Sequence, residues 1–250
     1  MNRYVYAGTV LPERAPCNLP DKLEFSAIAD ANEEMVECAM HIFANQIICE
    51  CNSKFPVNDL WTLRNSIAAF AQSILDVAGL SFAIGYTVEI KSVSYNGGAL
   101  VFPITFPGVA KELKPGEMTE LPVSVEILRR PLLVRACADI RSAILIPGDT
   151  GFFCYRAIES VGNQLIHDKY IKNKKESFDF FERELKIENR YYNFLKVVGG
   201  EARHGKIISI SGEERKHSVQ ISRATIMRIA EWYGGVKANW ENSILPEISL

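Results

Sequence analysis

The sequence lacks several features that assign a chain quickly to a functional class. No stretch approaches the roughly 20 consecutive apolar residues of a membrane-spanning helix. The opening residues, MNRYVYAGTVLPERAP, contain no apolar signal-peptide core. Internal repeats and low-complexity segments are missing too. We therefore expect a folded cytoplasmic protein, of a bacterium, without contact to a membrane.

Cysteine occurs without the spacing of a redox motif. The six cysteines include no Cys-x-x-Cys pair and lie in apolar surroundings, which suits reduced thiols. Cys38, His41, Cys49 and Cys51 are all zinc-ligand types. In the helix that we expect at 32–51, however, Cys38 and Cys49 are about 16 Å apart along the axis. Buried structural thiols are the favoured interpretation, and we predict no metal and no other cofactor.

Strong charge clusters and phosphate-binding signatures are also scarce. The net charge of -2 is the sum of 12 basic and 17 acidic residues in 1–149 (-5) and 16 basic and 13 acidic residues in 150–250 (+3). A phosphate-bearing partner is thus drawn to the second half first. Lys172, Lys174 and Lys175 form its densest basic cluster and are candidate binding residues, with a solvated helix end as the alternative.

The spacing of apolar residues predicts an α+β protein with two domains. Strands are expected at 3–11 and 22–29, helices at 32–51 and 58–78, and a hairpin of 83–95 with 99–106 around Asn96-Gly97-Gly98. A helix at 121–144, interrupted by Pro131, completes a mixed domain of unknown ligand at 1–149. Residues 150–250 are expected to form an all-α four-helix bundle with a C-terminal tail, with helices at 150–172, 176–187, 189–198 and 212–235.

A polar stripe on the first helix of this bundle is the main candidate site. Arg156, Glu159 and Asn163 share one helical face, and Arg203 and His204 follow a double glycine further on. An arginine can hold a phosphate and a histidine can move protons near neutral pH, which together suit metal-independent cleavage of RNA. The alternative is an ion-pair network in which Glu159 joins helices by pairing with Arg156 or Arg203.

A helical module with a polar residue on an early helix and an Arg-His element before a later helix resembles the HEPN superfamily, in particular the bundles of bacterial abortive-infection and other defence proteins. The resemblance covers about residues 150–235. It implies a bundle that pairs as a homodimer, and in catalytic members an arginine and a histidine separated by several residues. Here Arg203 and His204 are adjacent.

We therefore predict a non-enzymatic interaction or dimerisation protein with a HEPN-like helical module, in the context of bacterial defence. Its partner is a second copy or another protein, and RNA is a further candidate. The alternative is a metal-independent endoribonuclease that uses Arg203 and His204, with Arg156 and Glu159 in support.

Overall fold

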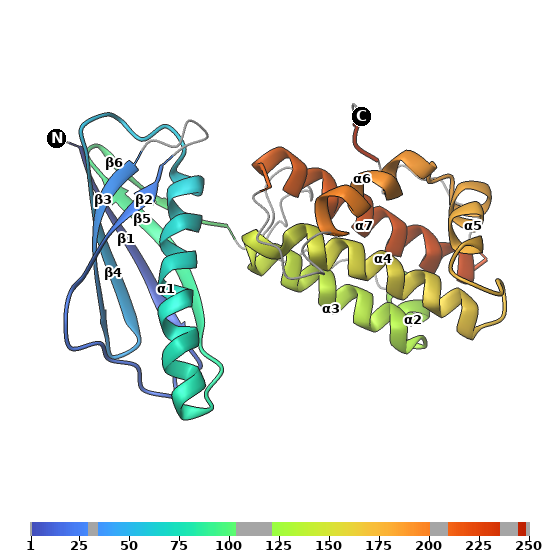
Figure 1. The fold of residues 1–250 in the computed structure, drawn as a ribbon, viewed down its shortest axis with the longest axis horizontal. Coiled ribbons are helices and arrows are strands. Elements are labelled where there is room, and N and C mark those ends of the chain that lie inside the picture. The colour runs from blue at the N-terminus through green and yellow to red at the C-terminus, as the bar shows by residue number, and fades with distance from the viewer. Residues whose placement is uncertain (1, 30–34, 104–121, 201–209, 236–244, 249–250) are drawn as a thin grey trace. The chain divides into compact units, whose positions relative to one another are not determined.

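The computed structural model describes residues 2–29, 35–103, 122–200, 210–235 and 245–248. The chain divides into two compact units, Met1–Ile104 and Thr105–Leu250, and each has its own hydrophobic core. Figure 1 shows a sheet with one helix in the first unit, and helices in the described part of the second. The predicted α+β class is confirmed.

Six antiparallel strands form the sheet of the first unit, in the order β2-β3-β4-β1-β5-β6. Buried and exposed residues alternate along the central strands, so one face of the sheet is packed and the other faces outwards. The strands are β1 (Asn2–Leu11), β2 (Leu23–Ile28), β3 (Met35–Phe43), β4 (Gln46–Ser53), β5 (Thr87–Tyr95) and β6 (Gly98–Val101).

The prediction of a helix at 32–51 is wrong, because β3 and β4 form a hairpin there. Phe43, which would lie on the apolar stripe of such a helix, is 74% exposed. The hairpin is closed by Ala44 and Asn45, which both have positive φ angles, as a two-residue turn of this kind requires. The Asn45 side chain holds the turn in place, since it accepts a hydrogen bond from the Cys17 amide and donates to the carbonyl of Val10.

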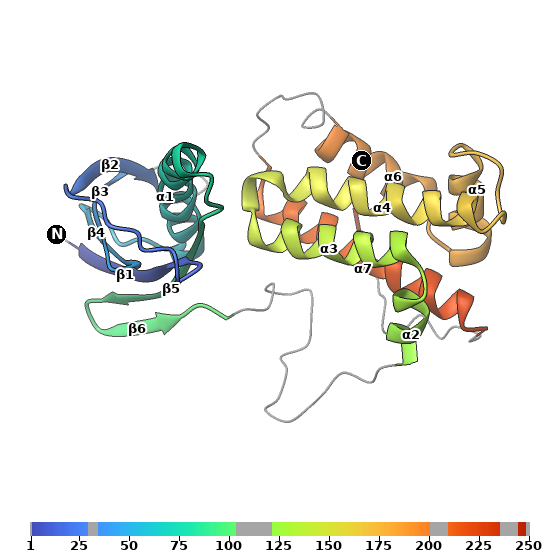
Figure 2. The same cartoon turned by 90° about the horizontal axis from the view of Figure 1, so that it is seen from below.

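One helix, α1 (Leu60–Phe82), covers the packed face of the sheet (Figure 2). Asp59 caps its N-terminus by accepting hydrogen bonds from the amides of Trp61 and Thr62. The helix extends beyond its predicted end at residue 78 to Phe82, and Gly79 allows the following chain to fold back closely. The Ile84 amide donates to the Gly79 carbonyl, and a Cβ at position 79 would overlap the Ile84 carbonyl.

The hairpin predicted around Asn96-Gly97-Gly98 is confirmed as β5 and β6. Tyr95 pairs with Gly98 across the turn, and Gly97 has the positive φ angle of 102° that favours glycine. The end of the predicted second strand, beyond residue 103, lies outside the described residues.

In the described part of the chain after residue 150, four helices lie close to the four predicted ranges. The helix predicted at 121–144 is interrupted as expected, and Pro131 is the first residue of a separate helix. The central helix of the unit, α4, packs against α3, α6 and α7. The described helices are α2 (Pro122–Leu128), α3 (Pro131–Leu145), the short 3-10 helix η1 (Pro147–Asp149), α4 (Thr150–His167), α5 (Glu176–Leu185), α6 (Asn189–Gly200) and α7 (Gly212–Tyr233).

The division between the units differs from the predicted boundary at residue 149. Residues 105–149 belong to the helical unit, because Leu133, Ala136 and Ala143 of α3 are buried in the same core as α4 and α7. The segment Ile146-Pro147-Gly148-Asp149 is therefore a turn within the second unit.

None of the helices in the described ranges is both long enough and apolar enough to cross a lipid bilayer.

Candidate functional site

The predicted polar stripe on α4 separates into two environments. Arg156 donates from Nε and from a second guanidinium nitrogen to Oδ1 of Asp139 on α3, at 3.0 Å for Nε. Asp139 is 2% exposed, and its Oδ2 has no hydrogen-bond partner in the described part of the chain. The Arg156 side chain also lies beside the rings of Phe152 and Phe153. Arg156 thus joins α3 to α4, and its charge is matched by a buried carboxylate.

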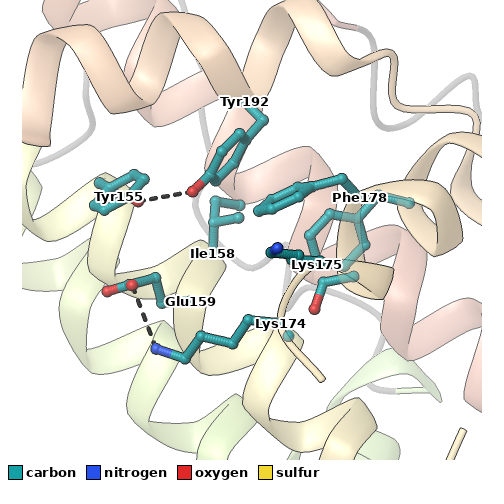
Figure 3. Close-up of a pocket in the computed structure, with 10 residues that line it drawn as sticks. Tyr155, Ile158, Glu159, Lys174, Lys175, Phe178 and Tyr192 are labelled. Atoms are coloured by element: carbon teal, nitrogen blue, oxygen red, sulfur yellow. Dashed lines mark hydrogen bonds and ion pairs between the residues drawn. The ribbon is translucent and has the colours of Figure 1, made fainter. Parts of the chain in front are cut away.

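Glu159, one turn further along α4, lines a pocket of about 190 Å³. Its carboxylate pairs with Nζ of Lys174 at 3.5 Å (Figure 3). Lys175 also borders the pocket. Two of the predicted basic binding residues therefore meet one of the predicted polar residues of α4.

Aromatic and aliphatic side chains make up most of the pocket wall. The hydroxyls of Tyr155 and Tyr192 are hydrogen-bonded at 2.7 Å, and the rings of Phe178 and Tyr192 lie 3.7 Å apart (Figure 3). Ile158 and Phe181 add apolar surface. Such a wall suits a planar apolar group.

Ser177 contributes a polar group that the sequence did not reveal. It is 3% exposed, and its Oγ has no hydrogen-bond partner among the described residues. The side chain borders the pocket opposite Gly162, where a Cβ would approach the Ser177 Oγ to 2.8 Å. A buried hydroxyl in this state retains an unused donor and acceptor.

The remaining predicted site residues do not join this pocket. Asn163 is half-buried on α4 and Lys172 is exposed, and neither is among the residues that line the pocket. Arg203 and His204 lie outside the described residues.

A second polar cluster surrounds Asp168, immediately after α4. Its carboxylate accepts hydrogen bonds from Tyr233 at 2.8 Å and from Gln164 at 3.0 Å, and His167 lies 2.9 Å away. Burial tends to raise the pKa of Asp168, but the hydrogen bonds from these side chains outweigh it and lower the pKa below its usual range. Asp168 therefore connects the segment that follows α4 with helix α7.

The first unit brings together three of the four zinc-ligand residues. Cys38 lies opposite Cys51 across the hairpin, with 3.1 Å between the sulfurs, and the Cys49 sulfur lies 3.8 Å from that of Cys51. Interaction with the neighbouring thiols of Cys49 and Cys51 lowers the pKa of Cys38, against the effect of burial. His41 is exposed on the opposite face of β3. The predicted distance between these cysteines is corrected, since it rested on a helix.

The described residues thus define a two-unit α+β protein with a small, mainly apolar pocket in its helical unit. Residues 4–100 match the model of the N-terminal domain of a family described as domain of unknown function (DUF8168), and residues 121–233 match the C-terminal domain of the same family. These two matches follow the division into two units. No curated protein and no solved structure matches the chain.

Proposed function

We propose that this chain is a non-enzymatic binding protein whose helical unit takes up a small molecule with a planar apolar part and a negatively charged group. The pocket beside Glu159 is the site. Its volume of about 190 Å³ corresponds to roughly six water molecules in the liquid, which suits a ligand of the size of benzoate.

The unpartnered hydroxyl of Ser177 carries this proposal. A buried hydroxyl without a partner destabilises a folded protein by about 1–3 kcal/mol. A bound polar group within reach of Ser177 Oγ would supply the missing hydrogen bond. This supports a ligand that places a polar atom beside Ser177.

The charged residues that line the pocket favour a negatively charged ligand. Lys174 is paired with Glu159, whereas Nζ of Lys175 has no ion-pair partner in the described part of the chain. The three charged residues at the pocket therefore sum to +1. An anionic group in the pocket is attracted by this excess charge.

The chemistry of the lining favours binding over catalysis. The residues that line the pocket include neither histidine nor cysteine, and its one carboxylate is paired with a lysine. A hydroxyl such as that of Ser177 needs a neighbouring base to act as a nucleophile. Among the described lining residues, the groups present bind and orient a ligand.

Titration of the full-length protein with benzoate and with benzamide, followed by NMR of the amide groups, tests the proposal. The two probes share a ring and differ in charge. We expect benzoate to shift the resonances of Gly162 and Ser177 at lower concentrations than benzamide does. Ser177→Ala and Lys175→Ala should each weaken benzoate binding.

Lys172→Ala is the matched control, because Lys172 is an exposed lysine that does not line the pocket. Its affinity for benzoate should equal that of the wild type. Equal binding of both probes would contradict the charge requirement, and unchanged binding by Ser177→Ala would contradict the role of the hydroxyl.

The second element of the proposal is a partner for the helical unit, either another copy of the chain or a different protein. The resemblance to HEPN bundles supports it, and it also supports bacterial defence as the context. The molar mass of the purified protein in solution tests self-association. If RNA is the partner, nucleic acid should co-purify with the protein. If Arg203 and His204 cleave RNA, His204→Ala should abolish the cleavage.

A further inference from the structure

Three cysteines converge inside the first unit, far in sequence from the pocket of the helical unit. Cys49 and Cys51 are two residues apart on β4, so both side chains point to the packed face, and Cys38 lies opposite Cys51 on β3. Cys38 is 4% exposed, and the other two are fully buried. The three sulfurs lie within 4.8 Å of one another.

These separations suit three sulfur ligands around one ion. A soft ion binds thiolate sulfur at about 2.3 Å. Three sulfurs are then about 4 Å apart when they surround the ion in a plane, and about 3.5 Å apart around a pyramidal ion that carries a lone pair. Two of the sulfur distances here are 3.1 and 3.8 Å. Binding therefore requires sulfur movements of at most about 1 Å, which rotation of the side chains can supply.

The hairpin holds the cysteines in a fixed frame. Their register depends on the two-residue turn at Ala44 and Asn45, and the Asn45 side chain is buried and hydrogen-bonded to the chain around Val10 and Cys17. A site supported by hydrogen bonds of this kind loses little conformational freedom when it binds an ion.

The number of ligands argues against zinc as the preferred ion. Structural zinc sites are almost always four-coordinate, and the described residues offer three cysteines here, while His41 faces away. Soft thiolate ligands suit thiophilic ions. An ion that is satisfied by three sulfurs fits better.

The net charge of the complex further restricts which ion the three thiolates would bind. Three thiolates carry a charge of -3, so their complex with Cu⁺ is -2, with Zn²⁺ it is -1, and with a trivalent ion it is neutral. No lysine or arginine in the described part of residues 2–103 is buried. A net charge in this core would therefore be expensive, and the neutral complex is favoured.

We propose that Cys38, Cys49 and Cys51 form a three-thiolate site for a thiophilic ion, with a trivalent metalloid of the arsenite type as the preferred one. Binding of arsenous acid is balanced as As(OH)₃ plus three thiols giving one As(SR)₃ and three waters. Arsenic stays trivalent, three S–H bonds and three As–O bonds break, and three As–S and three O–H bonds form.

Native mass spectrometry of the reduced, full-length protein tests this site. Separate samples are incubated with arsenous acid, with Zn²⁺ and with Cu⁺, long enough for the ion to reach a buried site. We expect one arsenic per chain and a mass increase of one arsenic less three hydrogens, which reports three thiolate ligands. Arsenic should bind more tightly than zinc.

Cys51→Ala removes the sulfur that is close to both others, and Cys38→Ala is the second variant in case the first does not fold. Each should weaken arsenic binding by more than about tenfold. Cys17→Ala is the matched control, since Cys17 is a buried cysteine of the same unit outside the cluster, and it should bind like the wild type.

Three results would overturn the site: no arsenic on the wild type, undiminished affinity in both cluster variants, or a Cys38–Cys51 disulfide that forms in reducing buffer and excludes the ion. Tighter binding of Zn²⁺ or Cu⁺ than of arsenous acid would overturn the preference for a trivalent ion. None of these results depends on the pocket of the helical unit.

Discussion

Arg156 on α4 donates two hydrogen bonds to a single carboxylate oxygen of Asp139 on α3. The sequence suggests that Glu159 pairs with Arg156 or Arg203. In the structure Arg156 instead pairs with Asp139, which lies seventeen positions earlier on another helix. The pair satisfies a carboxylate that is otherwise removed from water. It assigns Arg156 a role in holding two helices together.

Arg156→Ala should lower the free energy of unfolding by about 2 kcal/mol. Loss of one partner of a buried pair costs about 3–5 kcal/mol, and the Arg156 side chain, which is 34% exposed, reduces this value through solvent screening. Urea denaturation measures the change. In a double-mutant cycle with Asp139→Asn, the two substitutions should be strongly non-additive.

Arg183→Ala is the control for this experiment. Arg183 is 68% exposed and pairs with its neighbour Glu184, so its removal should change stability by less than about 0.5 kcal/mol. Additive effects of the Arg156 and Asp139 substitutions would show that the pair does not join the helices.

Ser177→Ala should raise the stability of the ligand-free protein by about 1 kcal/mol, because it removes a buried hydroxyl that has no described partner. Ser222→Ala is the comparison. Ser222 is also buried but donates to the Cys154 carbonyl at 3.2 Å, so its loss should be destabilising. Thermal unfolding of both variants measures these changes in stability. A destabilised Ser177→Ala protein would mean that the Ser177 hydroxyl of the wild type has a hydrogen-bond partner.

The long helices of the second unit were predictable because each presents one apolar stripe over many turns. Leu165 on α4 and Ile229 on α7 lie in the same core, as their helical spacing predicts. A stripe of this length has no competing interpretation as a strand, and the caps at residues such as Ser211 mark the helix ends.

The β3-β4 hairpin was not predictable from the same rules. Val36, Met40 and Ile47 recur at helical spacing, yet they also fit alternation when Cys38 and Cys49 are counted as buried. The decisive feature is the turn at Ala44-Asn45, which lacks glycine and depends on contacts of Asn45 with distant residues. Such contacts do not appear in a local pattern.

The candidate pocket was predictable only in part. Glu159, Lys174 and Lys175 are polar residues that drew attention in the sequence, and they border the same pocket. Ser177 looks like any serine near the start of a helix. Its importance comes from burial without a described partner, which is a property of tertiary packing.

Gly199→Ala should destabilise the helical unit by about 2 kcal/mol or more, as overpacking at a close contact does. The sequence predicts a helix at 189–198 that ends before the double glycine, but Gly199 lies within α6 and packs against α4. A Cβ at position 199 would overlap the carbonyl of Gly151. Alanine therefore forces the two helices apart, which urea denaturation detects.

Gly200→Ala tests the neighbouring position. Among the described residues, a Cβ there meets only the Lys196 side chain, at 3.8 Å. Alanine is a better helix former than glycine by about 1 kcal/mol in a helix interior, so this variant should be at least as stable as the wild type. Equal losses at both positions would rule out the close contact as the cause.

The acid stability of the helical unit should depend on Asp168. Its pKa is lowered in the folded protein, since burial is outweighed by the hydrogen bonds from His167, Tyr233 and Gln164. A carboxyl group whose pKa is lowered by folding contributes its full stabilisation at pH values above its pKa in the unfolded chain, about 3.9. This contribution is lost as the pH falls through the lower pKa of the folded protein.

Asp168→Asn should therefore be less stable than the wild type at pH 6, and this difference should shrink as the pH falls below about 4. Urea denaturation at several pH values measures it. Asp179→Asn removes the same charge from an exposed position on α5 and serves as the control. A difference between wild type and Asp168→Asn that stays constant from pH 6 to the lowest pH would show that the carboxylate is not stabilised by folding. In that case the hydrogen bonds of Tyr233 and Gln164 would stabilise the fold equally well with a neutral side chain at position 168.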